Sequence, residues 1–311
     1  MNIDFTGKRV LVAGVADDVG FGFAIAKEFA ESGAKVCVAG WPPALGIFET
    51  LLRRGKMDGS RKMANGSLLE FERVYPLDAA FDTLEQAPQA IRENKRYAER
   101  GDFSIQGLAD RMVAEFGPHP VDVIIHSLAN GPEVAKPLLD TTREGYLAAL
   151  SASSYSLVSM VRRFGPLMHP GDSFLSLTYL AAERVIPRYG GGMSSAKAAL
   201  EADTRYLAFE AGRRYGVRVN TISAGPYASR AASVTGAINT IVNFYTQNSP
   251  RPAELTPQDV ANSAVFLSSP RASAITGTTL YVDNGFHVMG KGLGEGDVDW
   301  VLKAGDVPRP G

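Results

Sequence analysis

Three side chains in one stretch of the chain could together carry out acid or electrostatic chemistry. Tyr179 follows an apolar run, Tyr189 precedes three glycines, and Lys197 lies in the first turns of a long segment with helical periodicity. A lysine near a tyrosine can hold sugar hydroxyls and stabilise a polarised phenol electrostatically. The same residues could instead be an aromatic core pair and a surface lysine, so a functional interpretation needs support from elsewhere in the chain.

A glycine-rich turn near the N-terminus provides that support. Gly14 ends an apolar run, and Gly20 and Gly22 open a helix-like segment. Glycine permits the tight turn and lets the backbone approach a pyrophosphate, while a helix N-terminus offers unpaired N–H groups. The spacing departs from the usual G-x-G-x-x-G, so a plain turn is the alternative. Its place between a strand and a helix predicts a dinucleotide site.

Residues that follow the other strand-like runs extend this site. The second run ends in Gly40-Trp41, without an acidic partner for an NAD ribose or a basic partner for a 2′-phosphate, so this rule does not choose between NAD and NADP. Trp41 offers a flat wall for an adenine ring, and Asp78 can accept a hydrogen bond from the adenine amino group. Ser127-Leu128-Ala129 ends the fourth run, where ligands of parallel sheets bind.

Short β-branched runs alternate with helix-length segments along the chain. Several runs are apolar on both alternating faces, which is typical of parallel strands covered by helices. The pattern predicts a single-domain, doubly wound α/β fold of the Rossmann type, with about seven strands and helices on both faces. The predicted strands are 9–15, 35–41, 72–78, 121–129, 172–181, 217–225 and 278–285. The predicted helices are 22–32, 104–116, 144–164, 193–215 and 258–268.

Three segments stand apart from this alternation within the expected domain, residues 1–291. Residues 42–71 and 79–103 are charged and turn-rich, and we interpret them as long irregular insertions. The first holds a basic cluster, Arg53, Arg54, Lys56, Arg61 and Lys62, which is either a solvated surface or a docking surface for an acidic carrier protein. Residues 227–250 mix small and large apolar side chains, as a mobile lid would. The tail, 292–311, is expected to be poorly ordered.

Composition excludes several classes of protein. Apolar residues make up 45% of the chain and charged residues 21%, which is ordinary for a soluble globular protein. The net charge of −1 gives no attraction to nucleic acid or an anionic membrane. Cys37 is the single cysteine and is expected in the core, and the four histidines lack zinc-ligand spacing, so no metal is expected. The N-terminus shows no signal or transit pattern.

The motifs together resemble the enoyl-acyl-carrier-protein reductases of the short-chain dehydrogenase/reductase superfamily, in the branch found in plastids and some bacteria. The matching segments include WPPALGIFETLLRRGK, VYPLDAAFD, HSLANGPEVAKPLLD, YGGGMSSAKAALEADTR, RVNTISAGP and YVDNG, and they extend from Gly7 to Gly290. They are specific, because most superfamily members place the lysine four positions after the tyrosine, whereas Lys197 follows Tyr189 by eight.

The resemblance implies NADH-dependent reduction of a trans-2-enoyl thioester on acyl carrier protein, the last step of the type II fatty-acid elongation cycle. It assigns Tyr189 to the thioester carbonyl, Lys197 to the cofactor ribose, and Tyr179 to the acyl pocket. The substrate residues it implies are Tyr179, Tyr189, Met193, Ala231 and Ala232. The cofactor residues it implies are Gly14, Val15, Ala16, Gly20, Phe21, Gly22, Trp41, Leu77, Asp78, Ala79, Ser127, Leu128, Ala129, Lys197, Ala224, Gly225, Pro226, Tyr227 and Ser229. Tyr227 departs from the aliphatic residue usual at its position.

Further expectations concern partners and rival functions. The resemblance implies binding of phenolic inhibitors of the triclosan type. Small residues on 144–164 and 193–215 predict close helix contacts and a homotetramer. The expected compartment is the cytoplasm for a bacterial chain and the plastid stroma for a plastid chain. The rivals are a carbonyl reductase or alcohol dehydrogenase of the same superfamily, and a nucleotide-sensing binding protein without catalysis.

Overall fold

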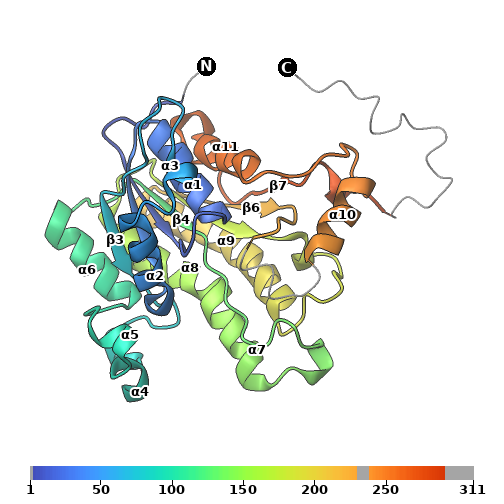
Figure 1. Cartoon of the computed structure of the whole chain (residues 1–311), viewed down its shortest axis with the longest axis horizontal. Coiled ribbons are helices and arrows are strands. Elements are labelled where there is room, and N and C mark those ends of the chain that lie inside the picture. The colour runs from blue at the N-terminus through green and yellow to red at the C-terminus, as the bar shows by residue number, and fades with distance from the viewer. Residues whose placement is uncertain (1–2, 230–237, 291–311) are drawn as a thin grey trace.

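Seven parallel strands form one sheet in the computed structural model, which describes residues 3–229 and 238–290 (Figure 1). The strand order is β3-β2-β1-β4-β5-β6-β7. The strands are β1 Arg9–Ala13, β2 Lys35–Gly40, β3 Arg73–Pro76, β4 Val123–His126, β5 Ser173–Thr178, β6 Arg218–Ala224 and β7 Thr279–Val282. Every strand lies inside the range predicted for it, so the predicted parallel sheet is confirmed.

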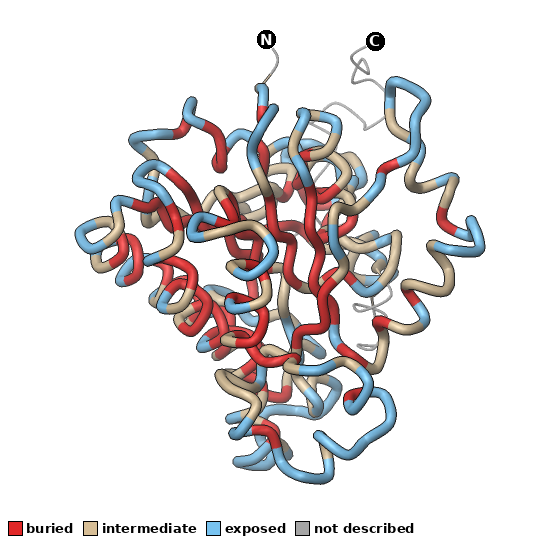
Figure 2. The backbone as a smooth tube through the Cα atoms, turned by 90° about the vertical axis from the view of Figure 1, so that its left-hand side faces the viewer, coloured by how far each residue is buried: buried red, intermediate tan, exposed pale blue. Residues whose placement is uncertain are grey.

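Alternation along the strands divides the core into two layers, one on each face of the sheet. Val10 and Val12 of β1 pack in one layer, whereas Leu11 and Ala13 pack in the other. The first layer is closed by α1 Phe21–Glu31, α2 Pro42–Arg53 and α11 Pro257–Ser268. The second is closed by α6 Ile105–Phe116, α8 Ser156–Phe164 and α9 Met193–Tyr215. Figure 2 shows the buried strands between these layers, so the doubly wound arrangement is also confirmed.

The predicted helix 144–164 is interrupted. It consists of α7 Arg143–Leu150, a π-helical turn η3 Ser151–Tyr155 and then α8. A π-helical turn holds about one more residue than an α-helical turn, so it shifts the phase of the helical pattern by one residue. The prediction of one continuous helix did not resolve this shift. The turn buries Ser153, which hydrogen-bonds both the backbone N–H and the carbonyl of Asn130 at 3.0 and 3.2 Å.

The interpretation of 42–71 and 79–103 as irregular insertions is wrong in part. α2 occupies the first twelve residues of 42–71, with Pro42 at its first turn and Leu45 and Phe48 buried. The basic residues Arg53, Arg54 and Lys56 at and after its C-terminus favoured an irregular interpretation of the whole range. The remaining helices of the two insertions are short: α3 Asp58–Arg61, the 3-10 helix η1 Leu84–Gln86, α4 Gln89–Arg92 and α5 Lys95–Ala98. Tyr97 and Phe103 pack edge to face in a small separate core.

The carboxyl edge of the sheet is where the predicted site residues meet. The chain reverses direction of winding between β1 and β4, and ligands of open α/β sheets bind at such a switch point. Gly14 follows β1, Ser127 follows β4, Tyr179 follows β5 and Gly225 follows β6. On the right-hand side of Figure 1, α10 Ile238–Asn248 lies near this edge.

Candidate active site

The glycine turn after β1 is shaped by close contact with β4. Gly14 has φ +104°, and a Cβ built on it would lie 2.0 Å from the carbonyl oxygen of Ser127. The Asp17 carboxylate then accepts the backbone N–H groups of Val19 and Gly20 at 3.0 and 3.1 Å. Gly20 is the N-cap of α1 and supplies no side-chain hydrogen bond. The turn therefore brings bare backbone to the start of a helix, as phosphate binding requires.

A cavity of about 450 Å³ opens from this turn across the carboxyl ends of the central strands. Predicted cofactor and substrate residues share it. Those that line it are Gly14, Val15, Ala16, Gly20, Phe21, Gly22, Trp41, Ser127, Leu128, Ala129, Tyr179, Tyr189, Met193, Lys197, Ala224, Gly225, Pro226, Tyr227 and Ser229. One continuous space thus joins the glycine turn to the Tyr179, Tyr189 and Lys197 group.

The two phenols form an edge-to-face pair inside the cavity. The ring centroids of Tyr179 and Tyr189 are 5.2 Å apart with an interplanar angle of 66°. The buried Tyr179 hydroxyl makes no hydrogen bond to any residue that the structure describes. Burial raises the pKa of both phenols, so both remain protonated hydrogen-bond donors at neutral pH. Two such donors facing an apolar space are suited to receive a substrate oxygen.

Lys197 lies buried on the first turns of α9, with 5% of its surface exposed. Its ammonium donates a hydrogen bond of 2.8 Å to the carbonyl oxygen of Leu177 in β5. Burial lowers the pKa of Lys197 to about 8, and the nearby Glu201 carboxylate opposes that shift. The alternative of a surface lysine is therefore wrong. A lysine ammonium has three donors, so contacts beyond Leu177 are available to a bound ligand.

A buried histidine lies beneath the cavity at the end of β4. The Ser156 hydroxyl donates to the carbonyl of Ala152 at 2.8 Å, so it must accept a hydrogen bond from His126 Nε2 at 2.7 Å. This fixes the tautomer with the proton on Nε2 and leaves Nδ1 bare. Burial, with the Lys197 charge, lowers the pKa of His126 to about 3. His126 is therefore neutral and adds no charge to the site.

Three of the predicted cofactor residues do not line the cavity. Leu77 is buried in the core, Asp78 directly precedes the insertion 79–103, and Ala79 is the first residue of that insertion. The Asp78 carboxylate accepts hydrogen bonds from Trp41 Nε1 at 3.3 Å and from the Tyr97 hydroxyl at 2.8 Å. Asp78 thus holds the exposed Trp41 ring at the rim, in addition to any contact with a ligand.

Several cavity residues were not predicted from the sequence. They are Asp17, Phe23, Gly131, Val134, Leu177 and Thr178. Ile238 and Ile241, which also line the cavity, belong to the predicted lid, 227–250. Asp17 could have been predicted, because an aspartate shortly before a glycine often accepts a hydrogen bond from the backbone N–H two residues later. Leu177 and Thr178 face the cavity only because the strand ends there. Ala231 and Ala232, predicted for the substrate, lie outside the described residues.

The fold and the cavity together define a class of protein. This strand order, with a glycine turn at the β1–β4 crevice, is that of a dinucleotide-binding protein. A buried lysine that lines the same cavity as two phenols is the arrangement typical of oxidoreductases of the short-chain dehydrogenase type.

Known proteins narrow this class. The family model described as Enoyl-(Acyl carrier protein) reductase matches residues 100–287. The chain is 57% identical to the chloroplastic enoyl-[acyl-carrier-protein] reductase [NADH] of Arabidopsis thaliana, over 94% of this chain and 74% of that protein. The crystal structure of the Plasmodium berghei reductase with triclosan aligns with TM-score 0.88 and 44% identity, over 91% of this chain and 99% of that one. The chain belongs to the NADH-dependent enoyl-acyl-carrier-protein reductase family.

Proposed function

We propose that this cavity reduces the double bond of a trans-2-enoyl thioester carried by acyl carrier protein. The carrying observation is that Tyr179, Tyr189 and Lys197 line the same space as the glycine turn. A nucleotide held at the turn and a substrate held at the phenols would then meet within one cavity of about 450 Å³. Enoyl-acyl-carrier-protein reduction is the activity named for the Arabidopsis relative.

The residues present fit a dinucleotide. The turn at Gly14 has no side chain to block a pyrophosphate, and the N-terminus of α1 begins at Phe21 behind an uncapped Gly20. Lys197 offers its remaining donors to ribose hydroxyls, and Trp41 offers its exposed ring to adenine. NADH, when bound, supplies the hydride.

The side chains would act as a preorganised electrostatic site. Tyr189 would donate a hydrogen bond to the thioester oxygen, on which negative charge develops as the β-carbon receives the hydride. A proton from solvent at the α-carbon would then complete the saturated thioester. Lys197 adds a positive charge and fixes the ribose, which sets the distance between the reacting atoms. Tyr179 and Met193 wall the acyl pocket, and Tyr227, which contacts Phe21 at a centroid distance of 5.7 Å, walls the nicotinamide side. These roles are our assignments.

A spectrophotometric assay tests this function. NADH oxidation is followed with an enoyl thioester, with a ketone and without substrate. Enoyl-dependent oxidation is the expected result. Oxidation with the ketone alone would support the carbonyl-reductase alternative, and no oxidation despite NADH binding would support the non-catalytic sensor.

We also propose the finer features of organisation. Residues 1–291 form one catalytic domain, and copies of the chain assemble into a homotetramer. Phenolic inhibitors would bind at the Tyr179–Tyr189 pair, since triclosan is bound to the Plasmodium relative. The Arabidopsis and rice relatives are chloroplastic, which supports the plastid stroma over a bacterial cytoplasm. No helix within the described residues is long and apolar enough to cross a membrane.

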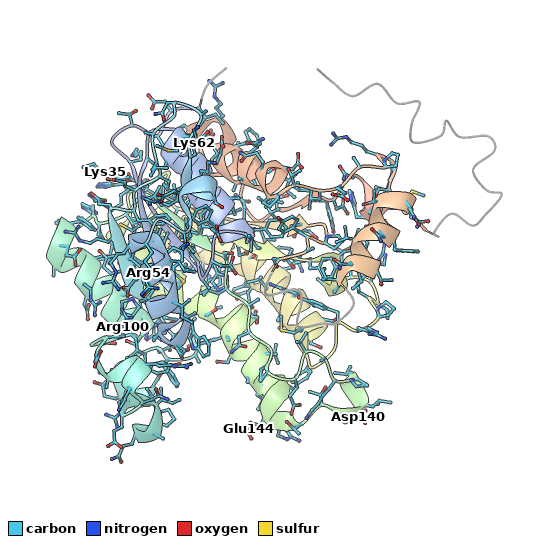
Figure 3. All side chains as sticks on the ribbon, viewed as in Figure 1. Lys35, Arg54, Lys62, Arg100, Asp140 and Glu144 are labelled. Atoms are coloured by element: carbon cyan, nitrogen blue, oxygen red, sulfur yellow. The ribbon has the colours of Figure 1, made fainter. Side chains whose placement is uncertain are left out.

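The basic cluster of residues 53–62 is better explained as solvated surface than as a docking site for the carrier. Arg61 is tied to the Asp58 carboxylate and to the Leu69 carbonyl at 2.9 and 2.8 Å. Figure 3 places Arg54 and Lys62 on the side that carries α2 and α3, across the molecule from α10. The cavity residues Ile238 and Ile241 lie on α10.

A further inference from the structure

Glu201 is a buried carboxylate next to the proposed site that none of the roles assigned above uses. It lies on α9 one helical turn after Lys197, and 6% of its surface is exposed. Its Oε1 accepts a hydrogen bond of 2.8 Å from the Thr178 hydroxyl, and Thr178 is the last residue of β5. Acidic side chains are rarely almost fully buried unless they have a bonding partner or a functional role, because burial disfavours their charged form.

Lys197 and Glu201 together fasten α9 to the end of β5. Lys197 holds the Leu177 carbonyl, and Glu201 holds the next residue, Thr178. Tyr179 follows directly, and its hydroxyl has no hydrogen bond to a described residue that could fix it. The position of the Tyr179 ring therefore depends on its backbone and on the neighbouring rings of Tyr189 and Tyr245, at centroid distances of 5.2 and 6.3 Å. The two α9 contacts hold that backbone in place.

The charge on Glu201 acts on Lys197 as well. An opposite charge one turn away favours the ammonium form of a buried lysine, whereas burial disfavours it. We infer that Glu201 is a positioning residue for the reaction proposed above: its charge keeps Lys197 cationic, and its contact with Thr178 fixes Tyr179. This inference rests on the proposed roles of Lys197 and Tyr179.

The other titratable groups around this pair do not supply the same effect. His126 of β4 is neutral, so it places no second positive charge beside Lys197. From the loop after β5, the phenols of Tyr179 and Tyr189 have pKa values raised by burial and stay uncharged. Glu183, which accepts a hydrogen bond from Tyr281 of β7, and Arg205 of α9 act on Glu201, with opposite signs.

Two substitutions separate the charge of Glu201 from its contact. Glu201→Gln removes the charge and keeps an oxygen for the Thr178 hydroxyl. Thr178→Val removes the hydrogen bond and keeps the charge. Glu183→Gln is the matched control: it removes a neighbouring exposed carboxylate outside the cavity and keeps an oxygen for the Tyr281 hydroxyl. Because the Glu183 charge disfavours the charged form of Glu201, its removal leaves Glu201 charged. For each variant, kcat and kcat/KM for an enoyl thioester are measured across neutral to alkaline pH.

In the parent, activity should fall as pH rises through the Lys197 pKa of about 8, since the ammonium is present only below it. This decrease is the alkaline limb of the pH profile. In Glu201→Gln the alkaline limb should move to lower pH by about one unit. Thr178→Val should lower kcat several-fold with the limb unmoved, and Glu183→Gln should leave kcat unchanged. A parent-like limb in Glu201→Gln, or parent-like kcat in Thr178→Val, would overturn the inference.

Two further variants keep the test decisive. If thermal unfolding shows that Glu201→Gln folds poorly, Glu201→Asp replaces it. This variant keeps the charge, so the alkaline limb must stay at the parent position while kcat falls. A moved limb there contradicts the inference. Lys197→Met measures the proposed function separately, because an alkaline limb that persists without the ammonium means that the role of Lys197, rather than that of Glu201, is wrong.

Discussion

Tyr179 and Tyr189 meet edge to face, with ring centroids 5.2 Å apart, although they lie ten positions apart in the chain. Tyr179 is fixed by the end of β5, whereas Tyr189 precedes the glycines that lead into α9. Their hydroxyls consequently reach the cavity from two different elements. The pair can hold one oxygen while leaving the apolar side of the pocket open to an acyl chain.

This arrangement predicts different effects for the two Tyr→Phe substitutions. Tyr189→Phe removes the donor assigned to the thioester oxygen, so kcat should fall by roughly 10² to 10³ with KM little changed. Tyr179→Phe should mainly raise KM and weaken binding of a phenolic inhibitor. Steady-state kinetics with inhibitor titration measures both. The reverse pattern, with kcat lost in Tyr179→Phe alone, would exchange the two roles.

The contact between Gly14 and Ser127 predicts a large effect of a single methyl group. A Cβ at Gly14 would lie 2.0 Å from the Ser127 carbonyl oxygen and would force an alanine to φ +104°. Gly14→Ala should lower the free energy of unfolding by at least about 1–3 kcal/mol. Gly20→Ala is the control, because its nearest atom would be 3.7 Å away. Chemical denaturation compares the two, and equal stabilities would contradict the contact.

Exposed aromatic side chains on α9 support the predicted homotetramer. Tyr206 and Phe209 are 68% and 62% exposed, and Ala198 and Ala202 lie exposed on the same helix. In the other predicted helix, 144–164, the small residues Ala149 and Ala152 are buried within the chain itself and are not available for a contact between subunits. Light scattering should give four times the 33.2 kDa chain mass. A monomer mass at micromolar concentration would rule the tetramer out.

A double substitution locates the interface. The double variant Tyr206→Ser, Phe209→Ser removes two large, exposed aromatic side chains that are not part of the core around the sheet. The subunit should therefore fold, whereas the assembly should dissociate. Arg214→Ser on the same helix, an exposed side chain paired with Glu210, is the control that should remain assembled. If the double variant keeps the parent mass, the contact lies elsewhere.

The predicted lid, 227–250, can be tested on the part that the structure describes. α10 is anchored at its C-terminal half, where Tyr245 stacks on Phe286 at a centroid distance of 3.8 Å. Its first half carries Ile238 and Ile241, which face the cavity. Hydrogen exchange at 238–242 should slow when NAD⁺ and an apolar ligand are both bound, and less with NAD⁺ alone. Equal protection in the apo, NAD⁺ and ternary forms would mean a permanently packed helix.

The sequence predicted those parts of the fold and site that depend on local pattern. The parallel strands were found because both faces of each are apolar, as Val10 and Leu11 illustrate. Gly14 and Lys197 were found because a phosphate turn and a tyrosine–lysine motif follow strands at recognisable positions. Boundaries differ by a few residues, since the sequence pattern continues past the last ladder hydrogen bond.

The features that were not predicted from the sequence depend on contacts between distant segments. Glu201 looks like an ordinary surface residue of a charged helix, and only its position against Thr178 shows that it is buried. The π-helical turn at Ser151–Tyr155 only shifts the phase of a pattern that was predicted as one continuous helix. Asp78 was expected to face a ligand, whereas the insertion supplies Tyr97 as an additional partner that could not be anticipated.

The most direct test of the whole site is calorimetric titration of NADH into the parent, Lys197→Ala and Tyr189→Phe. The site as we assign it places Lys197 on the ribose and Tyr189 on the substrate oxygen. Lys197→Ala should therefore weaken NADH binding by roughly 10- to 100-fold, the range for lost hydrogen bonds to a charged group, whereas Tyr189→Phe should bind NADH like the parent. If both variants bind NADH with the affinity of the parent, or if Tyr189→Phe loses more than Lys197→Ala, the proposed division of the cavity between cofactor and substrate is wrong.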